Sequence, residues 1–410
     1  MVEPDAPRRW VVVAEAPFLP ARAGGELEHL GFVQAALAAG VLAALIVPTD
    51  SDGVDIGRED DLPALRALVA PAPVLLTPRA RSVRSGLDPR TPYLIASRPV
   101  PGDLVGKVQR LVPDADAVLG FSYKTHKIAR VLAEGLRVPV VIRQHNLEGE
   151  YYRALAAAAK PPRAWAMRLE ALRVNRDERR LERASWLSAI ADISASDAET
   201  RRRRAKTRVE HVPTFALASA AAEAPMAWRG SDSKAVIFLG SLETATNHDA
   251  LRWFASRVWP EVLTAVPEAT WQIVGRRPTA FVRELALNTP NAELSADVAE
   301  PLAYLRSAAV AVNPAVSGSG VNIKLVDYLA VGLPVVSTTR GVRGLNLTAG
   351  SDLAVADKPE VFAAQVVTLL SDSVKAWDLA RTGHATALRI LDRGGSLAQL
   401  SRLFVRPGQP

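Results

Sequence analysis

The sequence predicts an α/β protein built from two doubly wound, parallel-sheet domains that face a central cleft. Short, wholly apolar runs alternate with longer Ala- and Leu-rich helical segments, as is typical of parallel sheets covered on both faces. This alternation stops at residues 213–234 and then restarts. The length of 410 residues also fits two domains, at roughly 100–200 residues per domain.

The first half, residues 1–212, contains one set of alternating elements. We expect strands or strand-like apolar runs at residues 10–14, 41–47, 117–119, 139–142 and 186–193. Helices are expected at residues 26–39 and 124–134, and a long helical zone at residues 149–184. Residues 213–234 contain Pro, Gly, Ala and Ser without a periodic pattern, which predicts an interdomain linker.

The second half, residues 235–388, repeats the architecture without repeating the sequence. Strands are expected at residues 235–239, 270–274, 310–312 and 334–337, and helices at residues 249–265, 322–330 and 359–370. Residues 389–410 include a helix around 397–405, which we expect to pack back on the first domain. Ligands of such sheets bind beyond the carboxyl ends of the strands.

Composition excludes several classes of protein. The chain has no Cys, which rules out a disulfide scaffold, an iron–sulfur cluster, a thiolate zinc site and a cysteine nucleophile. No run of 18 apolar residues and no signal-peptide pattern occurs, so we expect a cytoplasmic protein, with peripheral contact at the inner membrane face left open. The formal net charge of +7 permits attraction to phosphates or anionic lipid.

The most informative stretch is residues 313–338, NPAVSGSGVNIKLVDYLAVGLPVVST. A strand is followed by a turn of small residues and then by a helix, whose N-terminus suits a phosphate. Lys324 lies in the first helical turn, and Asp327 one turn further along can accept hydrogen bonds from a ribose diol. The alternative is a Gly-rich strand–helix turn with a solvated Lys and Asp.

This stretch resembles the donor-nucleotide signature of retaining GT-B glycosyltransferases of family four. The resemblance also includes FLGSLETATNHDALRWF, WQIVGRRP and TTRGVRGL, and so covers the second half. It implies a GT-B fold with two Rossmann-like domains, the first on the acceptor side and the second binding the nucleotide sugar. It further implies metal-independent transfer of a sugar to a hydroxyl acceptor (glycan, glycolipid or natural product) with retention. By resemblance, Lys324 contacts the diphosphate and Asp327 binds the ribose.

The sequence departs from the family pattern at its first acid. Relatives carry two glutamates in this motif, whereas here Asp327 holds the second position and Ser319 the first. Backbone N–H groups of Gly320 and Val321 can still serve the phosphate. Ser319 would then meet the donor sugar.

Five further positions are candidates for donor binding. Gly240 and Ser241 end the first strand of the second half, and Asn247 is the main polar residue of the following loop or else a helix N-cap. Arg276 follows another strand and either supplies a cation or is solvated. The backbone near Val298 would face the nucleobase by resemblance.

In the first half, Gly24 and Gly25 precede the first helix and resemble the family's Gly-Gly loop, which would face a diphosphate or an anionic acceptor. His145 follows the strand at 139–142, and by resemblance it contacts the donor sugar or orients the acceptor. A structural histidine is the alternative. The neighbouring Arg143 and Asn146 can also contact the donor sugar or orient the acceptor.

Other motifs lead elsewhere. Asp114 and Asp116 precede a strand, so we assign them to a polar turn rather than to a metal-binding Asp-x-Asp. We expect no cofactor, only a nucleotide-diphosphate sugar as substrate. The basic runs at 163–183 and 201–208 can be a solvated helical face and a basic loop. Alternatively, they form a patch that binds anionic lipid or a phosphate-bearing acceptor. Nucleic acid is not expected as a partner. A nucleotide-sugar epimerase and a silent nucleotide-sugar-binding protein remain the alternative functions.

Overall fold

The computed structural model describes residues 9–21, 24–50, 61–79, 91–215, 233–318 and 321–405. The chain divides into two compact units, one formed by residues 1–217 with 392–410 and the other by residues 218–391. We call them unit 1 and unit 2.

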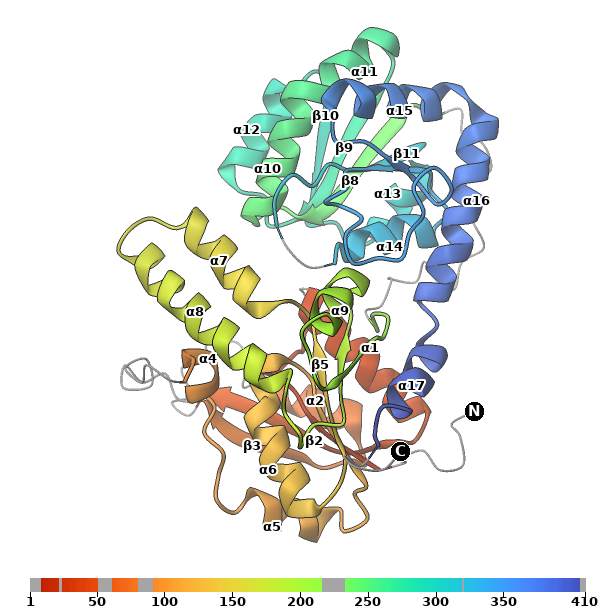
Figure 1. Ribbon diagram of the computed structural model, residues 1–410. Helices are drawn as coiled ribbons and strands as arrows, with labels where there is room; N and C mark the ends of the chain where they lie inside the picture. The colour runs from red at the N-terminus through yellow and green to blue at the C-terminus, as the bar shows by residue number, and fades with distance from the viewer. Residues whose placement is uncertain are drawn as a thin grey trace. The chain divides into compact units, whose positions relative to one another are not determined.

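Unit 1 is built on a seven-stranded parallel sheet with the order β3-β2-β1-β4-β5-β6-β7 (Figure 1). The strands are β1 Trp10–Val13, β2 Leu42–Asp50, β3 Val74–Arg79, β4 Ala117–Gly120, β5 Val140–Gln144, β6 Ala189–Asp192 and β7 Arg208–His211. The helices are α1 Gly24–Ala38, α2 Asp61–Val69, α4 Tyr93–Ala96, α5 Leu104–Leu111, α6 His126–Leu136, α7 Glu148–Ala158, α8 Arg163–Leu181, α9 Ala195–Arg202 and α17 Arg393–Ser401, with a 3₁₀ turn at Tyr123–Thr125.

The residues of β1 explain why this sheet forms a two-sided core. All four are buried, and because side chains alternate across a strand they enter two clusters. Trp10 and Val12 join the cluster that includes residues of α1 and α17, whereas Val11 and Val13 join the one that includes residues of α5, α6 and α8. The C-terminal segment closes the first face, with the Phe404 ring 4.8 Å from that of Trp10.

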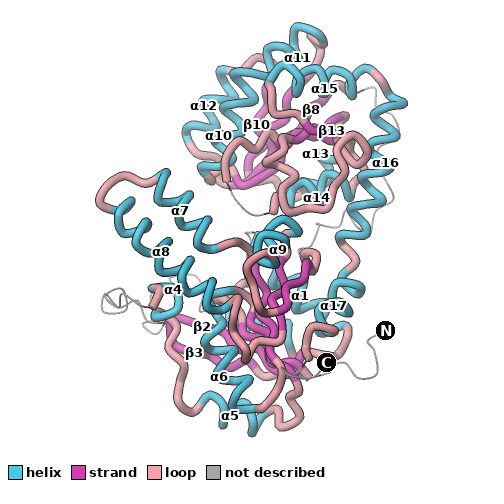
Figure 2. The backbone as a smooth tube through the Cα atoms, in the orientation of Figure 1, coloured by secondary structure: helices cyan, strands magenta, loops and turns pink. Residues whose placement is uncertain are grey.

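Unit 2 contains a six-stranded parallel sheet with the order β10-β9-β8-β11-β12-β13. Its strands are β8 Ala235–Ser241, β9 Thr270–Arg276, β10 Ala292–Ala296, β11 Val310–Asn313, β12 Val335–Ser337 and β13 Ala354–Val355. Its helices are α10 Ala245–Trp253, α11 Trp259–Ala265, α12 Ala280–Asn288, α13 Pro301–Ser307, α14 Ile323–Ala330, α15 Pro359–Ser371 and α16 Ser373–Ile390 (Figure 2).

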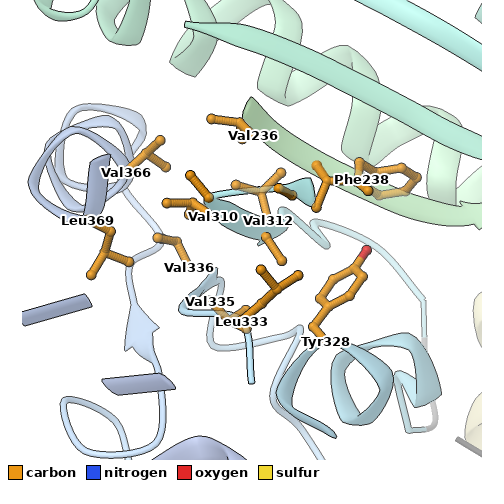
Figure 3. Close-up of a cluster of buried hydrophobic side chains, with 14 of the residues drawn as sticks. Val236, Phe238, Val310, Val312, Tyr328, Leu333, Val335, Val336, Val366 and Leu369 are labelled. Carbon is orange, nitrogen blue, oxygen red and sulfur yellow. The ribbon is translucent and has the colours of Figure 1, made fainter. Parts of the chain in front are cut away.

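One continuous core fills unit 2. Valines of β8, β11 and β12 lie against Leu369 of α15 and Tyr328 of α14, and the Tyr328 hydroxyl points towards the strand that carries Phe238 (Figure 3). That hydroxyl accepts from Leu239 N at 2.7 Å and donates to Leu239 O at 3.1 Å. The pair of hydrogen bonds fixes α14 to the end of β8.

Two expected helical segments contain more than one element in the structure. The helical zone expected at 149–184 consists of two helices, because Pro161 and Pro162 separate α7 from α8 and cannot continue a helix. The helix expected at 249–265 begins earlier and consists of α10, a π-helical turn at Phe254–Val258 and α11.

Candidate functional site

In both sheets the order in which successive strands are added reverses next to the first strand of the unit. In unit 1 the strand order reverses between β1 and β4, and in unit 2 it reverses between β8 and β11. In open α/β sheets the ligand crevice lies at such a switch point, outside the carboxyl ends of the strands. The candidate residues are therefore those that follow these four strands.

In unit 2 a short chain of hydrogen bonds joins the two sides of the switch point. Asn247 of α10 donates from Nδ2 to the Ser241 carbonyl at 2.7 Å. Its Oδ1 accepts from Lys324 Nζ of α14 at 2.8 Å. Three residues chosen from the sequence thus come together. Asn247 is not the helix N-cap, because α10 begins after Thr244 and Asn247 lies in its first turn.

The ammonium of Lys324 has only neutral neighbours at this end of the sheet. It lies 4.2 Å from the centre of the Phe238 ring, and no carboxylate of the described residues forms an ion pair with it. Burial without a counter-charge disfavours the charged form and lowers the pKa of Lys324 to about 7. An anionic ligand at this site would therefore stabilise the charged form of Lys324.

Two glycines let the strand ends lie close to this lysine. A Cβ on Gly240 would lie 3.0 Å from Asn247 Nδ2 and 3.5 Å from Lys324 Nζ. A Cβ on Gly275 of β9 would lie 1.9 Å from the Gly240 carbonyl oxygen, which no backbone can accommodate. The close pairing of β8 with β9 thus requires glycine at 275.

The segment before α14 is held by side-chain hydrogen bonds. Asn313 and Asn322 both donate from Nδ2 to the Gly341 carbonyl at 3.2 Å. Ser317 donates to Asp249 of α10 at 2.8 Å. The Asn322 and Ser317 bonds attach the loop to the segment after β12 and to α10, and the Asn313 bond attaches that same segment to β11, so together they position the start of α14.

The remaining unit 2 candidates have varied settings. Arg276 is exposed at the end of β9, Val298 is half-buried against the unit 2 core, and Val321 and Asp327 are half-buried at the start and middle of the α14 region. Ser319 and Gly320 lie outside the described residues. Tyr328 was not identified from the sequence, where its only signal was a tyrosine on the buried face of α14.

At the switch point of unit 1 there is a lysine whose charge is balanced by a carboxylate. Lys124, after β4, forms an ion pair with Glu15, after β1. Burial opposes ionisation of both groups. The charge attraction and the hydrogen bond between them outweigh that effect, so the pKa of Glu15 is lowered and that of Lys124 is raised. This pair was missed, because the two residues lie far apart in sequence and belong to no motif.

The glycine pair lies where the sequence predicts, at the start of α1. The Gly25 carbonyl accepts from Nδ1 of the buried His29 at 2.7 Å, while His29 Nε2 accepts from Glu15 N at 3.3 Å. These bonds assign the neutral Nδ1–H tautomer, in line with a pKa lowered by burial. A Cβ on Gly25 would meet nothing within 4 Å, so packing within the chain does not require this glycine.

His145 lies directly after β5 and close to His29. The two rings are 5.7 Å apart, and Phe121 lies 5.5 Å from His145. Burial, reinforced by His29, lowers the pKa of His145 to about 4. His145 Nε2 is buried without a hydrogen-bond partner among the described residues. A neutral imidazole with a spare nitrogen fits a hydrogen-bonding role better than a charge-bearing one.

Two neighbours of His145 have hydrogen-bond partners within unit 1. Arg143 is fully buried and donates to Glu28 at 2.6 and 2.9 Å, so its guanidinium serves a structural ion pair rather than a ligand. Asn146 is half-buried, and its carbonyl accepts from Arg201. Glu148, the first residue of α7, was not identified from the sequence; burial raises the pKa of its carboxyl group to about 7.

The basic run at 201–208 is not wholly a solvated loop. Arg201 is fully buried and forms ion pairs with Glu178, Glu182 and Asp192 at 2.9–3.3 Å. Arg204 also binds Glu182 at 2.7 Å. These contacts fasten α9 to α8 and β6.

The other sequence motifs have structural surroundings. Asp114 pairs with Arg9 at 2.9 Å, and Asp116 accepts from Arg9 N, so both lie in the polar turn before β4. Within the described ranges, no group of three or more His, Asp or Glu residues could hold a metal ion. None of the helices described is long and apolar enough to cross a membrane.

Comparison with known proteins relates unit 2 to one family. Residues 233–372 match the family described as "Glycosyl transferases group 1". A protein of Klebsiella pneumoniae named "Uncharacterized 44.6 kDa protein in cps region" is 27% identical over 139 residues. That alignment covers 32% of this chain and spans about a third (36%) of the relative.

Solved structures resemble the whole chain. HepE of Anabaena in complex with UDP and glucose has a TM-score of 0.62 at 13% identity, with 96% of this chain and 98% of that chain covered. TarM of S. aureus, in a complex that contains α-GlcNAc-glycerol and UDP, has a TM-score of 0.64 at 9% identity, with 97% and 99% covered. Sucrose-phosphate synthase from Thermosynechococcus elongatus has 0.60 at 13% identity, with 97% and 98% covered. The two parallel-sheet domains match these GT-B structures, so the expected fold class is confirmed.

Proposed function

We propose that this protein is a glycosyltransferase that moves a sugar from a nucleotide-sugar donor to a hydroxyl acceptor. The family match of unit 2, the GT-B fold and similarity to structures that contain UDP support this proposal. The observation that carries it is the uncompensated Lys324 ammonium at the switch point of unit 2. A desolvated cation without a carboxylate partner favours an anionic ligand such as a diphosphate.

We assign the donor to the residues around Lys324. Lys324, backbone groups near Gly240 and Val321, and the Ser241 hydroxyl would bind the diphosphate, and Asp327 would accept hydrogen bonds from the ribose. As the bond to the sugar breaks, negative charge grows on the leaving diphosphate. A fixed ammonium stabilises that charge, and it needs no large reorganisation at the moment of reaction.

We further propose that the transfer proceeds with retention and without a metal ion, as the resemblance to family-four transferases implies. The departing phosphate would take the proton of the acceptor hydroxyl. In unit 1 the neutral His145, with Nε2 unpartnered among the described residues, would accept or donate a hydrogen bond to a sugar hydroxyl.

A turnover assay tests the proposal. A panel of nucleotide sugars is incubated with and without hydroxyl acceptors, the released nucleoside diphosphate is quantified, and the anomeric configuration of any product is determined by NMR. Acceptor-dependent release with a glycosylated product supports the proposal. Conversion of the donor sugar without an acceptor indicates an epimerase, and tight binding without turnover indicates a silent binding protein; either result contradicts it.

A further inference from the structure

Helices α7 and α8 pack together as a hairpin in unit 1 (Figure 1). The inward side of α8 consists of Ala164, Ala171, Val174, Glu178 and Leu181, all buried. The opposite side of α8 is exposed, and it carries an unusual set of side chains.

Three large apolar residues lie exposed on this opposite side. Trp165 is 64% exposed, Leu169 51% and Leu172 66%. Their spacing of i, i+4 and i+7 puts them on one face of the helix. Single exposed leucines are ordinary on protein surfaces, but a contiguous row with a tryptophan marks an interaction surface.

The same side of the helix is cationic. Four exposed arginines accompany the apolar row, and none has an ion-pair partner among the residues that the structure describes: Arg168, Arg176, Arg179 and Arg180. We call these four arginines with Trp165, Leu169 and Leu172 the α8 outer face.

The acids of α8 are all turned inward. Glu170 accepts from Leu94 N at 3.4 Å and pairs with Arg173, and Asp177 accepts from the Tyr123 hydroxyl at 2.7 Å. Glu178 is buried and binds Arg201 and the Gly149 N–H. The helix therefore separates its charges: its carboxylates are used within unit 1, and the exposed charge is entirely positive.

We propose that the α8 outer face docks on a membrane surface containing anionic lipid. Charge complementarity selects the lipid, because four arginines without an exposed acid on the helix attract a negative headgroup layer. The tryptophan and leucines provide the apolar face of an interfacial helix, which enters the boundary between headgroups and acyl chains. This inference does not depend on the transfer chemistry proposed for unit 2.

Vesicle co-sedimentation of the full chain tests the docking. Vesicles of phosphatidylcholine with 30% phosphatidylglycerol should retain the protein, and vesicles of phosphatidylcholine alone should retain far less. The variant R168Q/R176Q/R179Q should bind the mixed vesicles about a hundredfold more weakly, since each basic residue near an anionic surface contributes about fivefold. The variant W165S/L169S/L172S should bind at least about tenfold more weakly even at low salt.

Matched variants in unit 2 separate this face from general charge and hydrophobicity. R257Q/R283Q/R381Q removes three exposed arginines, and L287S removes a leucine that is 86% exposed. Both should bind vesicles like the wild type, and circular dichroism should show all variants folded. Equal losses in the matched arginine variant, or equal binding to both kinds of vesicle, would overturn the proposal. So would a dimer in sedimentation velocity that W165S/L169S/L172S dissociates, because the face would then be a protein interface.

Discussion

Two lysines at equivalent places show how residue-scale electrostatics separates the units. Lys124 follows β4 in unit 1 and has its own carboxylate, Glu15, whereas Lys324 follows β11 in unit 2 and has a neutral amide and a phenyl ring. Burial acts on both ammonium groups, but only Lys124 is compensated. A ligand anion would supply Lys324 with the counter-charge that Glu15 gives Lys124.

The lowered pKa of Lys324 predicts pH-dependent binding. A nucleoside diphosphate favours the protonated ammonium, and in the free protein this proton is lost as the pH rises through about 7. Binding above pH 7 must therefore take up a proton, and affinity should fall by up to about tenfold per pH unit between pH 7 and 9. Lys324→Arg keeps its charge and should bind with a flatter profile. A wild-type affinity that is constant over this range would contradict the assignment.

The buried pair Arg143–Glu28 predicts a large effect on stability. Glu28→Gln leaves the guanidinium uncompensated and should lower the free energy of unfolding by about 3–5 kcal/mol in urea denaturation at pH 7. Glu28→Gln/Arg143→Met should recover part of the loss. Burial opposes ionisation of Glu28, but Arg143 lowers its pKa overall, so the contribution persists above the ordinary carboxyl range and fades as the pH falls.

An exposed pair provides the control for this experiment. Arg130 and Glu134 are each about half exposed and lie 2.7 Å apart. Glu134→Gln should change the free energy of unfolding by no more than about 0.5 kcal/mol. Similar losses for Glu134→Gln and Glu28→Gln would show that burial does not govern the Arg143–Glu28 pair.

At the element scale, the contact between β8 and β9 predicts a steric effect at Gly275. A methyl group there would lie 1.9 Å from the Gly240 carbonyl oxygen, so Gly275→Ala must separate the strand ends beside Lys324. We expect a loss of about 1–3 kcal/mol in the free energy of unfolding, together with weaker nucleotide binding. Gly102→Ala, where a Cβ would meet nothing within 4 Å, should change neither. Unaltered stability of Gly275→Ala would contradict the close pairing.

Central strands were predictable from sequence, and edge strands were not. The strand β1 is apolar throughout, and β5 and β11 begin with apolar runs, because both faces of these strands are buried. The strands β3, β10 and β13, each at the edge of a sheet, are partly exposed and contain residues such as Thr77, Pro78 and Glu293, so they lack that pattern. The α7–α8 break was missed although Pro161 and Pro162 mark it.

The candidate site was predictable where a motif surrounds a residue. Lys324, Asn247 and Gly240 were identified from strand ends and helix starts, and the structure brings them together. The Lys124–Glu15 pair was not identified, because its formation depends on β4 lying next to β1 in the sheet order. The spacing of residues in the sequence does not show that these two strands are adjacent in the sheet.

At the scale of the whole molecule, the proposal predicts activity without a metal ion. The leaving diphosphate would be stabilised by Lys324 and backbone N–H groups, so turnover with a nucleotide sugar and an acceptor should be unchanged in excess EDTA. The control is a second sample with added Mg²⁺. Turnover that EDTA abolishes and Mg²⁺ or Mn²⁺ restores would contradict the mechanism.

The central claim, that unit 2 binds a nucleotide diphosphate through Lys324, is tested most directly by calorimetric titration of the full chain. A panel of nucleoside diphosphates is titrated at pH 7 into the wild type, Lys324→Ala and the control Lys375→Ala, which changes an exposed lysine of α16. We predict that at least one nucleoside diphosphate binds the wild type and Lys375→Ala equally. Lys324→Ala should bind it about 1.5–3 kcal/mol more weakly, the range for charge-assisted hydrogen bonds. Equal affinity of Lys324→Ala and the wild type, or no binding of any nucleoside diphosphate, would contradict the claim.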